Sequence, residues 1–465
     1  MTVDKQTLQD VLARSLVKGI DLADIFVEEW QTMNIQMRNN MFKSITPAGQ
    51  KGAGIRLVKG LETYYCSTGD LDTDSLMTAA GEVAGMSKLE PAGRSIAIGE
   101  HKQEAFELAD STFTLPLADK LAYVQQGNDF AWNYSDKVVQ VIVSFSEYIR
   151  AIQLLNLDGH WVKENRNIIE FRVSVIVKDQ GKSFMATEGF GAYDDVTVFQ
   201  RRQPDQVAKD ACDLALRMLY AKPSPAGEMP VVIGNGAGGT GAVFHEACGH
   251  GLEADFQRKG ISVYRNQLGR QVASPLVSII DDATIPRRKG SFKYDEEGTP
   301  GQKTYAIKQG VLNTYLTDRI NGKDLDRYTG NGRRENFRYP PVPRQSNLYV
   351  DKGAHKKDEI IASVDKGLYV KRVGGGIVDS AKGDFSFNVL EGYLIEAGKL
   401  TEPVRGAVLT GNGPRVLKEI DMVADDLELG NGMGGCGKVN QFVPVDMGCP
   451  TLRIPRMIVG GTGSK

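Results

Sequence analysis

Two histidines and a glutamate lie close together in the segment HEACGH, residues 245–250, of a chain that has only five histidines. Neutral imidazoles are the usual nitrogen ligands of catalytic zinc. A glutamate beside them can take a proton from the water that such an ion activates. The residue types therefore predict a metal-dependent hydrolytic site, with His245 and His250 as ligands and Glu246 as the general base.

The spacing of the two histidines departs from the familiar zinc-protease pattern H-E-x-x-H, in which they are four residues apart on one helical face. Here they are five apart, which on a regular α-helix separates them by about 140°. A single-turn π-bulge, or a helix loosened at Gly249 and Gly251, would bring the two rings back together. The alternative is two unrelated histidines, one capping and one packed, and spacing alone leaves both open.

A catalytic zinc ion keeps three protein ligands and one open position, so a third ligand is needed. The candidates are Cys248 inside the segment, Glu253 after it, and the distant Cys436 and Cys449. Cys436 lies in a glycine-rich loop, where backbone can approach a metal closely, whereas Cys248 is only three residues from His245. A free cysteine is often simply a small buried apolar residue. Residue type and spacing alone do not identify which of them is the third ligand.

Composition indicates which class of protein carries this site. The chain has 465 residues, 41% apolar and 25% charged, which is typical of a globular protein with at least one large core. Its net charge of -2 argues against nonspecific electrostatic binding to nucleic acid. No apolar run approaches the ~20 residues needed to cross a bilayer, and the N-terminus lacks the apolar region of a signal peptide. Five scattered cysteines suit a reducing compartment, so we expect a cytoplasmic protein with no membrane or direct nucleic-acid partner.

The elements that position the site follow from hydrophobic patterning. Amphipathic helices are expected at residues 1–16, 72–88, 118–134 and 205–222, with short antiparallel strands between them. The second half is mostly short strands with glycine turns, including a clear hairpin at residues 393–404. Helices and strands that occur in runs favour an α+β fold. We expect an N-terminal helix-and-antiparallel-strand region, followed by a glycine-rich, mostly β C-terminal domain that carries the metal helix.

Glycine usage suggests where these two regions meet. Only 16 of the 52 glycines lie in residues 1–230, whereas 36 lie in residues 231–465. The shift falls just after a proline-containing stretch, which is typical of a boundary. We predict an N-terminal region over 1–222, divided into subdomains of about 1–115 and 116–222, and a C-terminal metallopeptidase domain over 223–465.

Five segments of the second half carry a resemblance to a known family. In chain order they are HEACGHGLEADFQRKG, KYDEEGTPGQ, TGNGRRE, GDFSFNVLEGYLIEAGKLTEPVRGAVLTGNG and NGMGGCGK. Together they resemble the TldD/PmbA family of metallopeptidases, also called modulators of DNA gyrase. The match is to the TldD-type subunit of that family, and the helix-and-meander order of the first half is similar as well.

The resemblance implies a specific ligand set. In that family the five-residue histidine spacing is the norm, and the third ligand is a cysteine in the C-terminal glycine-rich loop. Carried onto this chain, His245, His250 and Cys436 would hold one Zn²⁺ per chain, with Glu246 as general base. Cys248 stands where relatives usually have an aliphatic residue. We interpret it as a packing variant, with a secondary metal or redox role as the alternative.

Four further residues are candidates for the surroundings of the site. By resemblance Arg333 and Arg334 would lie near it and hold a peptide carbonyl or carboxylate, a surface salt bridge being the alternative. Glu253 and Asp255 would orient a histidine N–H, or else belong to a solvated helix face. The glycine-rich residues 234–241 lack the following Gly-Lys-Ser/Thr of a phosphate-binding loop, so a flexible entry to the metal helix is the simpler interpretation.

The function implied is a zinc-dependent peptidase that cleaves unfolded or short peptides inside a dimeric chamber. The expected partner is a PmbA/TldE-type paralogue, or a second copy of the chain. The alternative is a non-catalytic scaffold or peptide-binding subunit of the same complex. Family members of that kind lack the HExxxH motif, which this chain retains.

Overall fold

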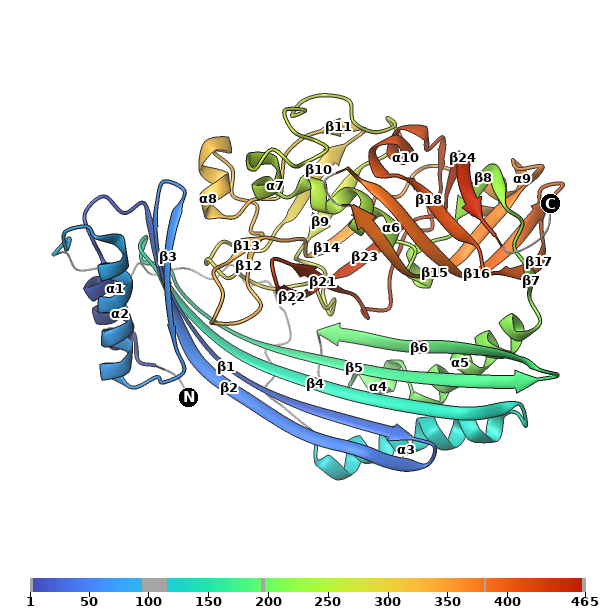
Figure 1. The fold of residues 1–465 in the computed structure, drawn as a ribbon, viewed down its shortest axis with the longest axis horizontal. Helices are drawn as coiled ribbons and strands as arrows, with labels where there is room; N and C mark the ends of the chain where they lie inside the picture. The colour runs from blue at the N-terminus through green and yellow to red at the C-terminus, as the bar shows by residue number, and fades with distance from the viewer. Residues whose placement is uncertain (1–2, 94–114, 194–196, 380–381, 462–465) are drawn as a thin grey trace.

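The computed structural model describes residues 3–93, 115–193, 197–379 and 382–461. Within them the chain is α+β, as the sequence predicts, with one large antiparallel sheet in the first half and several smaller sheets in the second. Figure 1 shows the long, curved first sheet lying along one side of the second half. None of the helices in these residues is long and apolar enough to span a membrane.

The first sheet has six strands in the order β3-β2-β1-β4-β5-β6. Their bounds are β1 (Leu22–Arg38), β2 (Met41–Lys59), β3 (Glu62–Thr68), β4 (Val138–Asn156), β5 (Trp161–Asp179) and β6 (Lys182–Tyr193). The expectation of short strands is wrong here, because β1 and β2 pair along their whole length as one hairpin. That hairpin turns at Asn39 and Asn40, both with positive φ, a conformation that asparagine tolerates.

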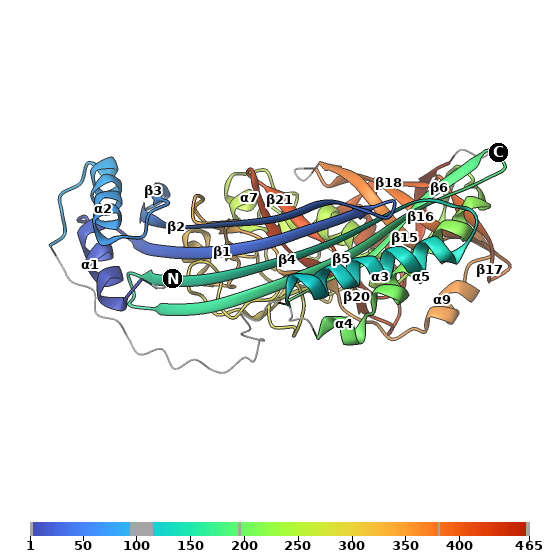
Figure 2. The ribbon, with the colours of Figure 1, turned by 90° about the horizontal axis from the view of Figure 1, so that it is seen from below.

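Within the described residues, helices cover one face of this sheet. They are α1 (Lys5–Ser15), α2 (Thr73–Ser87), α3 (Leu117–Tyr134), α4 (Val198–Arg201) and α5 (Pro204–Leu219). Figures 1 and 2 place α3 and α5 against the face turned away from the second half, and α1 and α2 at the far end. Two separate apolar clusters result, one under each helix pair. The opposite face of the sheet is therefore left to meet the second half.

The second half contains two larger sheets and two short hairpins. The mixed sheet consists of β7 (Lys222–Pro223), β8 (Gly227–Ile233), β15 (Lys366–Asp379), β16 (Asp384–Glu396), β17 (Lys399–Arg405), β18 (Val408–Asn412), β19 (Met422–Val423) and β24 (Leu452–Gly460). The smaller sheet consists of β9 (Ile279–Asp282), β10 (Lys303–Lys308), β11 (Val311–Leu312), β14 (Asn347–Val350), β20 (Glu428–Leu429) and β23 (Asp446–Cys449). The hairpins are β12 (Gly332–Arg333) with β13 (Val342–Pro343), and β21 (Gly435–Lys438) with β22 (Gln441–Pro444).

Helices are short in this half, and the predicted hairpin at residues 393–404 is present. The remaining α-helices are α6 (Ala242–Phe244), α7 (Ala254–Arg258), α8 (Arg319–Gly322), α9 (Lys357–Ala362) and α10 (Gly413–Glu419). In the hairpin, β16 turns into β17 at Ala397 and Gly398, both with positive φ. One large apolar cluster joins both larger sheets.

Buried ion pairs connect the two halves. The guanidinium of Arg56 on β2 contacts Asp24 on β1, at 2.5 Å, and Glu297 of the second half, at 2.7 Å. Arg334 of the second half contacts Asp24 from the other side, at 3.1 Å. Glu296 accepts from Arg166 on β5. All of these side chains are almost completely buried, so buried charges form part of the contact between the two halves.

Candidate metal centre

The two histidines of HEACGH lie on a local π-helical turn. His245–Gly249 forms this turn directly after α6, and His250–Leu252 continues as a 3₁₀ turn before α7. A π-turn has more residues per turn than an α-helix, because its hydrogen bonds span five residues, so residues five apart come close to the same side. The imidazole centroids of His245 and His250 are 5.5 Å apart. The local backbone thus removes the objection that a regular helix would raise.

Gly249 allows this turn to pack closely. A Cβ built on Gly249 would lie 2.1 Å from the side-chain oxygen of Gln345, which is completely buried. The amide nitrogen of Gln345 donates to the carbonyl of His245 at 3.3 Å. A glycine is therefore required here by close approach to a neighbouring segment.

Cys436 reaches the histidines from the other end of the chain. It lies on β21, whose partner β22 places it opposite Val443. Its Sγ is 3.4 Å from Nε2 of His250, and one ligand atom from each of His245, His250 and Cys436 lies within 4.8 Å of the others. All three residues are buried. Among the described residues, these three form the His/Cys/Asp/Glu group that could hold a metal ion.

The ionisation of Cys436 differs from that of the other candidate cysteines. Burial raises the pKa of the Cys436 thiol, but the imidazoles of His245 and His250 outweigh it and lower that pKa to about 5. Burial raises the pKa of Cys248 and of Cys449 to about 12. A thiolate is the form that binds metal. Of the three buried candidates, Cys436 has the environment of a ligand.

His245 supplies a direct test of whether these residues fit a metal. The side chain is completely buried, yet neither ring nitrogen makes a hydrogen bond of ordinary geometry to any described residue. A buried polar atom without a partner is costly. Two imidazoles and a thiolate are also a donor set that zinc accepts. The residues fit a divalent metal of zinc type.

Glu246 borders this cluster and also faces a cleft. Its carboxylate oxygens are 3.9 Å from Nε2 of His245 and 3.6 Å from Nε2 of His250, and its side chain is 34% exposed. Burial raises its pKa, but the two histidines outweigh this and lower the pKa below its usual value. Glu246 lines a cleft of about 530 Å³, and half of its lining residues are glycine, most of them within residues 374–376 and 430–435. An ionised base therefore stands between the cluster and an accessible space.

Glu253 and Asp255 are buried rather than solvated. Oε2 of Glu253 is 3.1 Å from Nδ1 of His250, the ring nitrogen that faces away from Cys436. Nζ of Lys438 donates to Glu253 at 2.8 Å, to Asp255 at 2.6 Å and to the carbonyl of Pro343 at 2.9 Å. Glu253 orients the ring of His250, and Lys438 neutralises the two carboxylates.

Lys438 is a site residue that the sequence reasoning missed. It is two residues after Cys436, and alternate residues of a strand share a face. Strand alternation could have identified it, once residues 435–438 were assigned to a strand rather than to a loop.

The two arginines of TGNGRRE have different surroundings. Arg333 donates to the carbonyls of Gln345 at 2.6 Å and Pro444 at 2.8 Å, so it holds the β21–β22 hairpin against the segment that packs on Gly249. Arg334 is completely buried at the contact between the two halves. The residues therefore brought together at the cluster are the two histidines, Cys436, Glu246, Glu253 and, through Lys438, Asp255.

The glycine-rich residues 234–241 are packed tightly. A Cβ on Gly236, Gly238 or Gly241 would lie within 2.5 Å of backbone atoms of neighbouring segments. The hydroxyl of Thr240 donates to the carbonyls of Gly234 and Asn235 at 2.8 Å. This loop packs the π-turn of His245–Gly249 against the sheets.

The fold and this cluster together define the class of a metallopeptidase. The chain belongs to the PmbA/TldA metallopeptidase family. The model of the family's C-terminal domain matches residues 226–461, that of its central domain residues 110–219, and that of its domain 1 residues 23–87.

Named relatives cover nearly the whole chain. The chain is 36% identical to the "Metalloprotease TldD homolog" of Haemophilus influenzae, over 98% of this chain and 96% of that one. It is 33% identical to the protein of the same name from Buchnera aphidicola subsp. Acyrthosiphon pisum, over 99% and 98% of the two chains.

Solved structures share the fold. A Thermotoga maritima protein described as a modulator of a DNA gyrase aligns with a TM-score of 0.79 at 20% identity, over 98% of this chain and all of that one. TldE from Thermococcus kodakarensis aligns with a TM-score of 0.76 at 16% identity, over 98% of this chain and all of that one.

Proposed function

We propose that this protein is a zinc-dependent peptidase of the TldD type, with one Zn²⁺ per chain held by His245, His250 and Cys436. The observation that carries the proposal is a buried set of three ligand atoms within 4.8 Å of one another, next to a partly exposed carboxylate. The orphaned ring nitrogens of His245 and the lowered pKa of Cys436 support it.

Zinc in such a site supplies Lewis-acid polarisation of a carbonyl and a water of lowered pKa. Glu246 accepts the proton of the attacking water and passes it to the leaving amine nitrogen. Glu253 keeps the ring of His250 in one orientation through Nδ1. Lys438 holds Glu253 and Asp255 in place, so the hairpin that carries Cys436 also steadies the turn that carries His250.

The substrate is an extended peptide, unfolded or short, that lies in the glycine-walled cleft beside Glu246. The glycine stretches of its walls let a peptide backbone approach closely, as in recognition by strand addition. The β15–β16 ladder shifts register between Val373 and Gly376, and the glycines of this bulge, Gly374 and Gly375, line the cleft. A backbone-reading cleft accepts many sequences.

The working form is a dimer that encloses the site, formed with a PmbA/TldE-type paralogue or with a second copy of the chain. The fold shared with TldE of Thermococcus kodakarensis is consistent with related subunits. We also propose that the chain divides into domains near residue 222 and into N-terminal subdomains near residue 115. The same proposal includes a cytoplasmic location and no direct binding of nucleic acid.

The second candidate is a scaffold or peptide-binding subunit without catalysis. The intact ligand set and the ionised Glu246 favour the peptidase over this alternative.

Metal analysis combined with activity tests the proposal. The purified protein should contain one zinc per chain and hydrolyse an unstructured peptide. A chelator should abolish hydrolysis, and added zinc should restore it. Protein that carries no stoichiometric metal at neutral pH, and cleaves no peptide when zinc is added, would favour the scaffold.

A further inference from the structure

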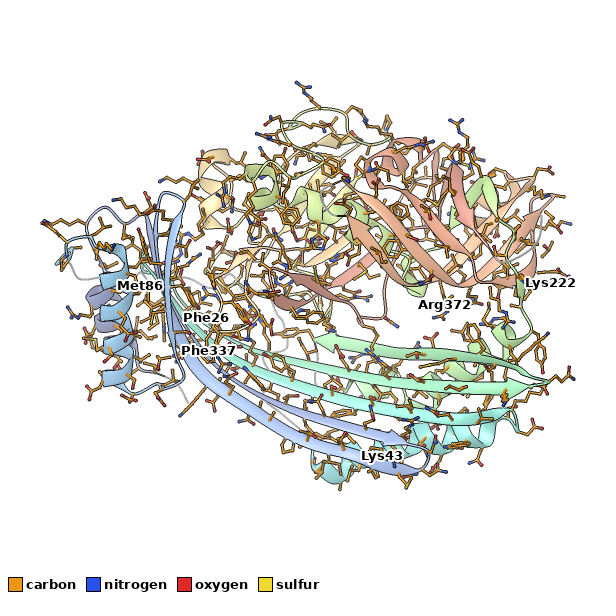
Figure 3. The ribbon with its side chains drawn as sticks, viewed as in Figure 1. Phe26, Lys43, Met86, Lys222, Phe337 and Arg372 are labelled. Atoms are coloured by element: carbon orange, nitrogen blue, oxygen red, sulfur yellow. The ribbon has the colours of Figure 1, made fainter. Side chains whose placement is uncertain are left out.

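A second cleft separates the edge of the N-terminal sheet from the second half. Its volume is about 740 Å³, and it is lined by parts of β6, α4, α5 and β15 together with residues 286–288 and 428–431. Figures 1 and 3 show this arrangement, with Arg372 lying where β15 faces β6. Arg372 pairs there with Glu188 of β6, and the backbone N–H of Gly191 on β6 donates to the carbonyl of Asn431 at 2.7 Å, so the cleft is bridged at these two points.

This cleft has an excess of positive charge. Seven of its lining side chains are basic, three from residues 201–217, two from 287–288 and two from 371–372, whereas four are acidic. Several of the bases share one counter-ion at the bottom. Glu391, which is completely buried, contacts Arg217, Lys371 and Arg372.

The three cations that share Glu391 keep exposed surface. Arg217 is 35% exposed, Lys371 43% and Arg372 23%, against 0% for their carboxylate. Arg372 also pairs with the buried Glu188, so three partly solvated positive charges face two buried negative ones. The accessible surface of the cleft therefore presents cations, while the opposing charge lies behind them.

The basic cleft adjoins the cleft of Glu246. Gly430 and Asn431 line both spaces and form a wall that the two clefts share. A peptide that lies beside Glu246 in extended form and continues past this wall would reach the basic cleft, at ~3.3 Å per residue.

We propose that this basic cleft binds an acidic segment of the peptide substrate, on one side of the bond that is cleaved. The inference rests on the proposed peptidase function and adds a preference for substrates rich in Asp and Glu. A peptide fits better than nucleic acid, because the cleft adjoins the cleft of Glu246, which is half lined by glycine, and the chain as a whole carries a net charge of -2.

The test measures binding separately from catalysis. A fluorescent glutamate-rich peptide and its glutamine counterpart are titrated against Glu246→Gln protein loaded with zinc. The acidic peptide should bind about tenfold more tightly at low salt, and the preference should fade as ionic strength screens the charges.

Charge reversal identifies the cleft as the source of that preference. The variant carries Arg201→Glu and Arg287→Glu, two exposed lining residues, in the Glu246→Gln background. The affinity ratio of the two peptides should fall from about tenfold toward one. The matched control is Lys43→Glu, an exposed site at the tip of the β1–β2 hairpin and far from Arg372 in Figure 3, which should keep the ratio.

Equal affinities in the parent, or a ratio that survives the reversal, would overturn the inference. A parent enzyme that cleaves both peptides with equal efficiency would do so while leaving the peptidase proposal intact. Displacement of the acidic peptide by single-stranded DNA at comparable concentration would show that the cleft attracts any polyanion, and would overturn the assignment to peptide.

Discussion

At the residue scale, Cys436 differs from the other buried cysteines in what surrounds its sulfur. Burial raises the pKa of the Cys248 and Cys449 thiols, and within the described residues neither has an imidazole beside it that would lower that pKa. Cys436 faces two imidazoles across the gap between β21 and the π-turn. The geometry agrees with the ligand set that the family resemblance implies and that sequence spacing left open.

Replacing Cys436 by alanine should release the metal, because it removes the anionic ligand of a three-ligand set. Cys248→Ala should retain one zinc per chain and lose about 1 kcal/mol of stability from the smaller side chain. Metal analysis of the two purified variants distinguishes them. Zinc retained by Cys436→Ala and lost by Cys248→Ala would reverse the assignment.

The sequence identified the chemistry of single residues better than their surroundings. His245, Glu246 and His250 follow from residue type and proximity. Lys438, by contrast, is significant only because β21 turns it toward Glu253 and Asp255, some 180 residues earlier in the chain. Arg334 illustrates the same limit, since its main partner Asp24 lies 310 positions away. Charge pairs of this separation leave no local pattern.

At the element scale, the π-turn depends on the absence of a side chain at Gly249. Gly249→Ala should force the buried amide of Gln345 away from the carbonyl of His245 and cost about 1–3 kcal/mol. It should also weaken zinc binding, because His245 moves with the turn. The control is Gly437→Ala, which is next to Cys436 but has open space around a built Cβ. Zinc affinity, by competition with a chelator, should fall only for Gly249→Ala, and equal affinities would contradict the argument.

The β21–β22 hairpin is secured to the metal turn by Lys438. Lys438→Met would leave Glu253 and Asp255 buried without the lysine that they share, and breaking a buried pair typically costs about 3–5 kcal/mol. Lys259→Met removes the other lysine that contacts Asp255, but that lysine is 46% exposed, so the loss should be at most about 1 kcal/mol. Denaturant unfolding of both variants provides the comparison. Equal stabilities of the two variants would show that Lys438 does not stabilise the buried carboxylates more than Lys259 does.

At the scale of the whole molecule, the contact between the two halves is built from buried charges. The α+β class and most helix positions could be predicted from patterning. The length of β1 and β2 could not, because the first part of β2 is exposed and its second part is buried, which conceals the continuity of one strand. The interface itself has no sequence signal.

Arg334 tests this contact directly. Arg334→Met would remove one of the cations that pair with the buried carboxylate of Asp24. The free energy of unfolding should fall by about 3–5 kcal/mol. Arg338→Met, an exposed change a few residues away, should alter stability little. The unfolding midpoint of each variant measures the difference. A parent-like midpoint for Arg334→Met would mean that the charged contact does not hold the halves together.

The most direct test of the central claim compares the parent with Glu246→Gln, each carrying one zinc per chain, in the hydrolysis of an unstructured peptide. The substitution keeps the three proposed ligands and removes the base, so zinc content should be unchanged while kcat falls by about 10²–10⁴. Glu419→Gln, a glutamate on α10 whose side chain is 25% exposed, should keep parent activity. Cleavage by zinc-loaded Glu246→Gln at the parent's rate would contradict the account.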